Sequence, residues 1–283
     1  MAITQGFERA AIGKWSEPVG FPITRDRIRA YAAATNDPIA PHVAGDYAPP
    51  VFSSVPVYAP ASRALIEAIP GHLLMMALPT AQDFHFHAPL LPDTTVATRA
   101  AVIGMQTNGG GVTVTVETHT HDEDGRLLVR QFLTTVVRGT SIPEAIGDEA
   151  PGHRLEPSVR DRVPDAIAEQ TFDRDQSRRY AEASGDPLPI YTDDELARSL
   201  GLPGAIVHGL CAMAFASVPV IRHLCPEDPT RLGRLAVRFG EVIRPGTSIV
   251  TRVWDASDRE HVFETRAGEG TVVMTDGLAE VVS

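Results

Sequence analysis

Two short bends that contain proline carry residue types suited to moving protons near neutral pH. The first bend holds Asp37 and His42, five residues apart, and the second holds Asp186 and Tyr191 at the same separation. An imidazole, with an ordinary pKa of ~6.5, exchanges protons readily at neutral pH, whereas a phenol, with a pKa of ~10, does not. An aspartate before a proline is also a common turn residue. The pairing of Asp37 with His42, and its repetition at Asp186, favours general acid–base chemistry over a turn role alone.

Helical and strand-like patterns surround both bends in the same order. Apolar residues recur at helical spacing around each bend and alternate with polar residues in the runs that follow. In the first half we predict helices at 24–35 and 54–68, and strands at 82–87, 94–103, 111–120 and 127–137. In the second half we predict helices at 172–183, 193–200 and 208–223, and strands at 235–239, 248–254, 261–266 and 271–282. The repeated order indicates a duplicated α+β unit, in which an antiparallel sheet wraps a helix.

Matching positions in the two halves have similar offsets. Asp37 matches Asp186 at an offset of 149 residues, and Ser54 matches Gly209 at an offset of 155. A segment rich in Pro, Gly, Asp and Glu separates the halves and is the natural linker. The predicted boundaries are an N-terminal domain at 1–138, a linker at 139–164 and a C-terminal domain at 165–283.

Composition narrows the possible partners. The 283 residues are 43% hydrophobic, which is enough for a packed core. The chain has 25 Lys and Arg against 36 Asp and Glu, a net charge of -11, which disfavours binding to nucleic acid or to an anionic membrane surface. Two cysteines cannot form a disulfide framework or a structural zinc site. Since we find no apolar run typical of a signal peptide or a membrane span, we expect a cytoplasmic protein.

The second bend and the segment after it resemble a known family pattern. Residues 180–191 read Tyr-Ala-Glu-Ala-Ser-Gly-Asp-Pro-Leu-Pro-Ile-Tyr, and residues 205–209 read Ala-Ile-Val-His-Gly. This is similar to the pattern of MaoC-like (R)-specific enoyl-CoA hydratases, also called hydratase 2, and the first half resembles the dehydratase-like N-terminal domain often fused to them. The resemblance implies a double hotdog, two tandem hotdog folds that each wrap a long central helix in an antiparallel sheet.

The same resemblance implies an activity. It is the reversible hydration of a 2-enoyl-CoA to an (R)-3-hydroxyacyl-CoA, in which the CoA thioester is the substrate and no cofactor or metal takes part. In the family, an aspartate and a histidine five residues later hold the water, and a glycine N–H at a helix start holds the thioester oxygen. Homodimerisation is also expected from the family.

The two halves keep different parts of this site. The first half keeps Asp37 and His42, which we predict to be the catalytic pair. Ser54 stands where the family has its glycine, and Ser62 follows eight residues later, so we predict that both bind the substrate or the oxyanion. The second half keeps that glycine as Gly209, a further predicted oxyanion group.

Three alternatives remain open from the sequence. The second bend could itself be the active site, with Asp186 and with Tyr191 as an acid or hydrogen-bond donor. The chain could instead dehydrate 3-hydroxyacyl groups on an acyl carrier protein in lipid or polyketide assembly, or bind acyl thioesters without catalysis. A thioesterase shares the fold, but the paired Asp and His favour hydration.

Other polar residues have simpler interpretations. His85 and His87 alternate along a predicted strand without a cluster of carboxylates or cysteines, so we expect no metal there. His119 and His121 are expected to face solvent. Two groups of arginines could meet the phosphates of CoA or could form ion pairs with nearby aspartates: Arg174, Arg178 and Arg179, and Arg231, Arg234 and Arg238.

Overall fold

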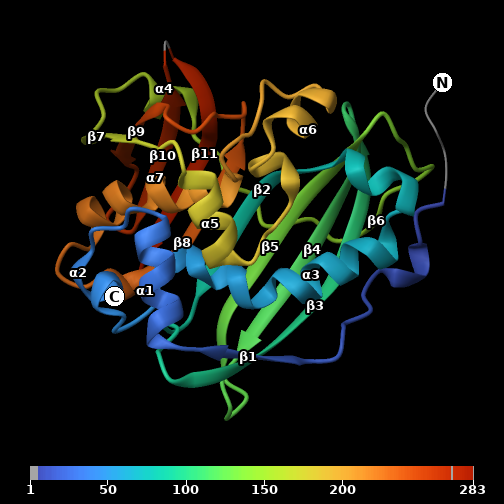
Figure 1. The fold of residues 1–283 in the computed structure, drawn as a ribbon, viewed down its shortest axis with the longest axis horizontal. Coiled ribbons are helices and arrows are strands. Elements are labelled where there is room, and N and C mark those ends of the chain that lie inside the picture. The colour runs from blue at the N-terminus through green and yellow to red at the C-terminus, as the bar shows by residue number, and fades with distance from the viewer. Residues whose placement is uncertain (1–5, 269, 283) are drawn as a thin grey trace. The chain divides into compact units, whose positions relative to one another are not determined.

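The computed structural model describes residues 6–268 and 270–282, which form two compact units (Figure 1). Unit 1 contains the chain up to Pro22 together with 56–87 and 95–152, and unit 2 contains 23–55, 88–94 and the chain from His153 onward. The first bend therefore belongs to the same compact unit as the second half of the chain. These compact units group segments by their contacts in space and do not follow the sequence boundaries at 138 and 165. The domain boundaries expected from the sequence therefore stay a prediction.

Unit 1 is an antiparallel sheet with a long helix across it. Its strands follow the spatial order β1-β3-β4-β5-β2, and the short β6 pairs with β3. Helix α3 lies across these strands (Figure 1). The strands are β1 (Val19–Ile23), β2 (Ala77–Phe86), β3 (Thr94–Asn108), β4 (Gly111–His121), β5 (Leu127–Arg138) and β6 (Ile146–Gly147), and the helices are η1 (Arg9–Ala11), α3 (Ser54–Ala68) and η3 (Gly71–Met76).

The core of unit 1 follows from strand alternation. Val112, Val114 and Val116 of β4 are fully buried and pack in one cluster with Ala61 and Ala68 of α3. Side chains at every second position of a strand point to the same face. The alternating valines therefore bury that face of the sheet against the helix.

Unit 2 has the same kinds of elements. Its strands follow the order β8-β11-β10-β9-β7, and each neighbouring pair is antiparallel. The strands are β7 (Ala166–Thr171), β8 (Leu232–Phe239), β9 (Ser248–Asp255), β10 (Glu260–Ala267) and β11 (Thr271–Val281). The helices are α1 (Arg25–Ala34), α2 (Ala40–Ala44), η2 (Pro50–Ser53), α4 (Pro157–Arg160), α5 (Gln176–Ser184), η4 (Pro189–Tyr191), α6 (Asp194–Ser199), α7 (Gly209–Leu224) and η5 (Pro229–Arg231).

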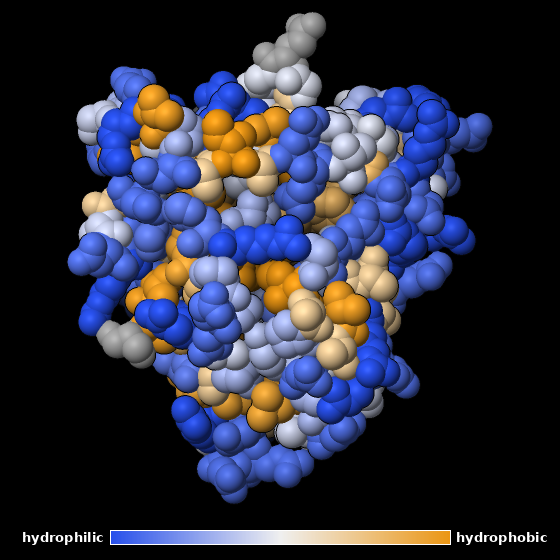
Figure 2. All heavy atoms as spheres, turned by 90° about the vertical axis from the view of Figure 1, so that its left-hand side faces the viewer, coloured by the Kyte–Doolittle hydropathy of each residue, from blue (hydrophilic) through white to orange (hydrophobic). Residues whose placement is uncertain are grey.

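Helix α7 is the central element of unit 2. Every residue from Cys211 to Ile221 is buried, so this helix is covered on all sides, as expected for an apolar helix inside a core. The long helix and antiparallel sheet in each unit confirm the predicted α+β hotdog class. No helix in the described part of the chain is long and apolar enough to cross a membrane. On the face shown in Figure 2, apolar side chains form patches between hydrophilic ones.

Several elements depart from the sequence-based prediction. Strands β1, β6 and β7 and helix α4 were not expected, and α2 replaces part of the expected bend. Helix α2 is only five residues long and contains His42, so the histidine of the predicted catalytic pair lies on a helix. The predicted helix at 172–183 begins later, at Gln176.

Candidate active site

The first bend begins where α1 ends. Thr24 caps the start of α1 by accepting a hydrogen bond from the backbone N–H of Arg27 at 3.2 Å. The chain leaves the helix through Asn36, which has a left-handed φ of 50°, a conformation that asparagine tolerates better than most residues. The N–H of Asp37 then donates to the carbonyl of Ala32 at 2.9 Å, which fixes Asp37 beside the helix end.

The carboxylate of Asp37 is held at both oxygens. Oδ1 accepts the backbone N–H of Ile39 at 2.8 Å, and Oδ2 lies 2.7 Å from Nδ1 of His42. The His42 side chain is fully buried and that of Asp37 is 5% exposed. The structure thus brings together the two residues that the sequence predicts as the catalytic pair.

The other ring nitrogen of His42 has a different environment. Nε2 is buried and has no hydrogen-bond partner among the described residues. When Nδ1–H of a neutral imidazole donates to a carboxylate, Nε2 is left as the unprotonated, basic nitrogen. A buried polar atom without a protein partner calls for a functional explanation.

Two arginines of α1 hold α2 in place. Arg25 donates through Nη1 to the carbonyl of Gly45 at 3.0 Å and to the carboxylate of Asp46 at 3.0 Å, and Arg29 donates through Nε to the carbonyl of Ala44 at 3.0 Å. These bonds satisfy carbonyls at the C-terminal end of α2, where positive charge is favourable. Gly45 has a φ of 72°, and a Cβ there would lie 2.8 Å from Arg25 Cγ, so glycine is required.

Helix α5 braces the end of α1 within unit 2. Gln176 donates its side-chain N–H to the carbonyl of Ala34, and Arg179 donates to the carbonyl of Ala33 at 2.9 Å and to Oδ1 of Asn36 at 3.1 Å. These contacts fix the residue directly before Asp37. Because Arg179 is occupied in this way, it is a positioning residue for the bend and not a free phosphate-binding group.

Aromatic rings surround the pair. Tyr47 meets His42 edge-on, with ring centroids 5.3 Å apart, and burial together with nearby carboxylates raises the pKa of Tyr47 to about 12. The hydroxyls of Tyr31 and Tyr180 lie 3.4 Å apart, and burial raises the pKa of both phenols well above their ordinary value. All three tyrosines therefore stay protonated at neutral pH.

The second bend has a similar backbone and different side chains. Oδ1 of Asp186 lies 3.4 Å from the N–H of Leu188, and the backbone carbonyl of Asp186 lies 3.3 Å from Nε2 of His208. The ring of Tyr191 stacks on that of His208, with centroids 3.4 Å apart. Burial lowers the pKa of His208 to about 4, partly offset by the bond to the Asp186 carbonyl, so His208 is neutral near pH 7.

The predicted oxyanion residues lie at two helix starts. Gly209 is the first residue of α7, and a Cβ there would lie 3.2 Å from the ring of Phe239. Ser54 is the first residue of α3, but its N–H is directed back at the carbonyls of Val51 and Phe52. Its hydroxyl donates to the Val51 carbonyl at 2.8 Å. Ser62 lies within α3 and is partly buried.

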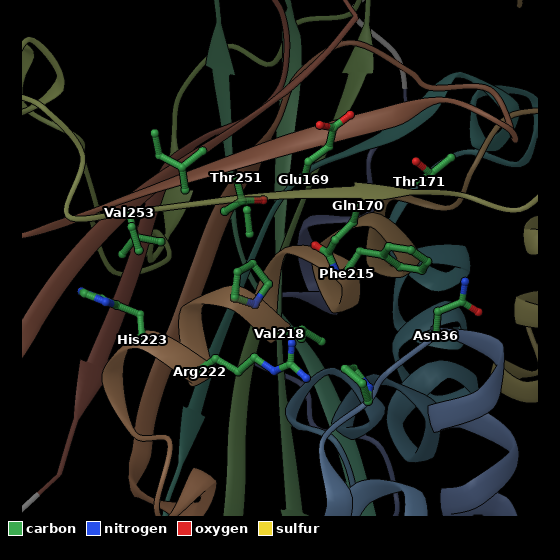
Figure 3. Close-up of a pocket in the computed structure, with 15 residues that line it drawn as sticks. Asn36, Glu169, Gln170, Thr171, Phe215, Val218, Arg222, His223, Thr251 and Val253 are labelled. Atoms are coloured by element: carbon green, nitrogen blue, oxygen red, sulfur yellow. The ribbon is translucent and has the colours of Figure 1, made fainter.

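A cavity of about 590 Å³ lies in unit 2 beside the first bend. Asn36 and Pro38, the two neighbours of Asp37, form part of its wall. Figure 3 shows residues of α7 facing β7 across it, with Asn36 at one end and His223 at the other. The lining from α7 is Phe215, Val218, Pro219, Arg222 and His223, and that from β7 is Ala166 to Thr171. This volume is in the range of small-molecule sites.

Comparison with known proteins identifies the family to which this chain belongs. Residues 157–277 match the family described as MaoC-like domain, and residues 10–131 match the FAS1-like dehydratase domain region. The chain is 30% identical over 211 residues to the 3-hydroxyacyl-thioester dehydratase Y of Mycobacterium tuberculosis, a match that covers 71% of each protein. The chain belongs to the MaoC-like hydratase and dehydratase family.

Other MaoC-like proteins extend the comparison. The chain is 28% identical over 207 residues to the probable enoyl-CoA hydratase 2 of Dictyostelium discoideum, covering 72% of this chain and 70% of the relative. The structure of a MaoC-like dehydratase from Phytophthora capsici superposes with a TM-score of 0.82 at 23% identity, covering 95% of this chain and 96% of that one. A Mycobacterium tuberculosis protein described as a double hotdog fold superposes with a TM-score of 0.62 at 13% identity, covering 95% of this chain and 96% of that one. These likenesses confirm the predicted fold.

Some features of this MaoC-like chain could not be found from its motifs. Arg25 and Arg179 brace the bend through backbone carbonyls, an interaction that leaves no pattern in the sequence. Tyr31 and Tyr180 are an exception, because their spacing of 149 residues equals the offset between Asp37 and Asp186. That shared offset was a usable signal for a buried pair.

Proposed function

We propose that this MaoC-like protein catalyses the reversible addition of water to a 2-enoyl-CoA, giving an (R)-3-hydroxyacyl-CoA, at the first bend. The observation that carries the proposal is the buried pair of Asp37 and His42, joined at 2.7 Å, with Nε2 of His42 unpartnered. Relatives named enoyl-CoA hydratase 2 and 3-hydroxyacyl-thioester dehydratase support the same reaction in its two directions.

Each residue of the pair would have a separate role. Asp37 would hold the Nδ1–H of His42, which leaves Nε2 free to take a proton from water. The water oxygen would bond to the β-carbon of the enoyl group as the electrons of the double bond move toward the thioester oxygen. The protonated His42 would then return the proton to the α-carbon. The sum of these steps is addition of one water molecule, so the balance requires no redox cofactor.

The thioester oxygen would be held at the start of α3. A helix start offers unpaired N–H groups and a partial positive charge, which suit an oxygen that gains negative charge in the transition state. Ser54 stands where the family has its glycine. Because its N–H faces the carbonyls of Val51 and Phe52, the substrate oxygen would compete with that turn for the same hydrogen. The roles of Ser62 and Gly209 stay predictions.

The acyl chain would occupy the cavity beside Asn36 and Pro38. The apolar part of the wall, from Phe215, Val218 and Pro219 of α7, suits a hydrocarbon chain, and Asn36 and Pro38 on either side of Asp37 form part of the same cavity. The second half of the chain would therefore contribute binding surface, while the first bend contributes the chemistry.

A dehydratase acting on an acyl carrier protein is the second candidate. The match of residues 10–131 to the FAS1-like dehydratase region favours it, since the same site would run the reaction in reverse on a different carrier. Homodimerisation and a cytoplasmic location stay predictions.

The activity test follows the absorbance of the enoyl thioester when purified protein is added to crotonyl-CoA, to a longer-chain enoyl-CoA and to crotonyl-acyl carrier protein. Oxidation of the product by (R)- and (S)-specific 3-hydroxyacyl-CoA dehydrogenases assigns the stereochemistry. We expect hydration of the CoA thioesters to the (R) product. Preference for the carrier-protein substrate would support the second candidate, and no turnover of any enoyl thioester would contradict both.

A further inference from the structure

Two histidines and an aspartate converge at one end of unit 2, away from the catalytic pair. Nε2 of His223 lies 2.9 Å from Oδ1 of Asp255, and Nδ1 of His261 lies 2.7 Å from the same oxygen. One ligand atom from each of the three residues lies within 4.8 Å of the other two. The hydration mechanism uses none of these side chains.

The fold fixes the three residues from three elements. Asp255 ends β9 and His261 lies near the start of β10, and the two residues are directly opposite in the antiparallel register. His223 lies in the last turn of α7, where the helix dipole favours a positive charge. The backbone N–H of Asp255 donates to a carboxylate oxygen of Asp165 at 2.9 Å, which fixes the end of β9.

The chemistry of the donors suits a transition metal ion. Two imidazole nitrogens and a carboxylate oxygen are typical ligands of Zn²⁺, which binds them at about 2.0–2.2 Å. Ligands at these lengths in a tetrahedron are separated by about 3.4 Å. The two nitrogen–oxygen separations of 2.9 and 2.7 Å are shorter than this, so a small outward rotation of the side chains would accommodate the ion.

Solvent access and charge are also suitable. The Asp255 side chain is 43% exposed, that of His223 is 26% exposed and that of His261 is 11% exposed, so an ion can enter from solvent. The Asp255 carboxylate supplies an anionic oxygen, a ligand type that a divalent cation favours.

We propose that His223, Asp255 and His261 form a binding site for a divalent transition metal ion of the zinc type. Three protein ligands leave a fourth position for water or another small ligand. His223 also lines the end of the 590 Å³ cavity opposite Asn36, so the ion lies next to the cavity wall. No metal is expected in this chain from its sequence, and this site leaves no compact motif because His223 and His261 are 38 positions apart.

The competing explanation is a hydrogen-bond clamp. In that case His223 and His261 would only fasten the end of α7 to the β9–β10 hairpin through the Asp255 carboxylate. A clamp predicts that removing Asp255 lowers stability equally with and without metal. A metal site predicts that added zinc stabilises the wild-type protein and fails to stabilise the variant, because only the native site binds the ion.

The experiment uses untagged full-length protein that has been treated with a chelator and dialysed. Zinc chloride is titrated by isothermal calorimetry at pH 7.5, and bound metal is counted by mass spectrometry after dialysis. We expect one zinc ion per chain. Asp255→Asn and His261→Gln should each weaken binding at least tenfold, while His72→Gln, which changes an exposed histidine of unit 1, should leave it unchanged.

Thermal melts with and without zinc complete the test. Zinc should raise the midpoint for the wild type and for His72→Gln, and should leave Asp255→Asn unchanged. If one variant does not fold, the other and His223→Gln provide the same comparison. Zinc that binds without a fixed stoichiometry, or equally well to the wild type and to Asp255→Asn, would overturn the proposal and leave only the clamp.

Discussion

The bends that end α1 and α5 share a backbone plan. Each leaves its helix through a residue with left-handed φ, Asn36 at 50° in the first bend and Gly185 at 74° in the second. In each, an aspartate oxygen accepts the N–H two residues later, at 2.8 Å for Asp37 and at 3.4 Å for Asp186. The turn is therefore maintained in both halves, and it is tighter in the first.

The two bends differ chemically in the side chain that lies five residues after each aspartate. In the first bend it is His42, whose Nδ1 meets the carboxylate of Asp37 and whose Nε2 remains unpartnered. In the second bend it is Tyr191, which stacks on the neutral ring of His208. A phenol with a pKa near ~10 is a poor proton carrier at neutral pH. We therefore expect this one residue to decide which bend can perform acid–base chemistry on a similar backbone.

The largest expected effect comes from removing the imidazole of the first bend. His42→Ala should lower kcat/KM for crotonyl-CoA by about 10²–10⁴-fold, because proton transfer by a positioned side chain contributes this much. Tyr191→Phe is the matched change in the second bend and should leave kcat/KM within about threefold, since it removes only a phenol that does not exchange protons. A larger loss in Tyr191→Phe would reverse the assignment of the two bends.

Replacing the carboxylate of the pair by an amide should have a smaller effect on kcat/KM than removing the imidazole. In Asp37→Asn, the side chain no longer carries the charge that stabilises a protonated His42, so we expect kcat/KM to fall by about 10²-fold. The matched variant is Asp186→Asn, for which we expect a change of less than threefold. Equal rates for the wild type and Asp37→Asn would show that His42 works without its partner.

His208, which packs against the second bend, should instead make the free energy of unfolding depend on pH in the acid range. The pKa of His208 is about 4 in the folded protein, against an ordinary value of 6.5, so the unfolded chain binds more protons between these values. This contribution to stability is fully present above pH 6.5 and is lost as the pH falls toward 4. Between pH 7 and pH 5 the loss is about 2 kcal/mol.

Urea unfolding at pH 7 and pH 5 measures this effect. In His208→Gln the titrating imidazole is absent, so the decrease in unfolding free energy between the two pH values should be smaller than in the wild type. Subtracting the decrease in unfolding free energy of His208→Gln from that of the wild type gives the contribution of His208, because the other titrating groups are the same in both proteins. Identical pH dependence in both proteins would show that His208 does not carry the acid sensitivity.

The cavity wall should affect substrate choice more than chemistry. Val218→Phe fills part of the cavity that α7 lines, so we expect kcat/KM for a long-chain enoyl-CoA to fall about tenfold relative to crotonyl-CoA. Ile66→Phe, at an exposed position of α3, is the control. An equal decrease for both substrates would mean that the acyl chain lies elsewhere.

The sequence predicted the long elements well because their patterns extend over many residues. The predicted helix at 54–68 has the bounds of α3, and the one predicted at 208–223 is displaced by one residue from α7. Strand β7 was missed because its side chains are only partly buried, with Ile167 62% exposed, so no clear apolar face marks it. Helix α2 has five residues, too few for a helical period to be visible.

The candidate site was predictable in its residues and unpredictable in its contacts. The five-residue spacing of Asp37 and His42 indicated the pair, but the unpartnered Nε2 depends on the surrounding packing. The sequence predicts that His119 faces solvent, yet it bonds Glu117 at 2.8 Å and packs against the tilted ring of Trp15, with ring centroids 4.4 Å apart. Alternation along a strand specifies a face, and only the three-dimensional structure shows what covers that face.

The smallest expected effect comes from the helix start that would hold the thioester oxygen. Ser54→Ala keeps the backbone N–H and removes the hydroxyl that donates to the Val51 carbonyl. If the N–H is the oxyanion donor, kcat should stay within about threefold of the wild type. If the hydroxyl itself turns to the substrate, its removal should cost about 10²–10³-fold in kcat, as for other single oxyanion donors. Because Gly209 has no hydroxyl, the first outcome would mean that both helix starts offer the substrate the same kind of group, a backbone N–H.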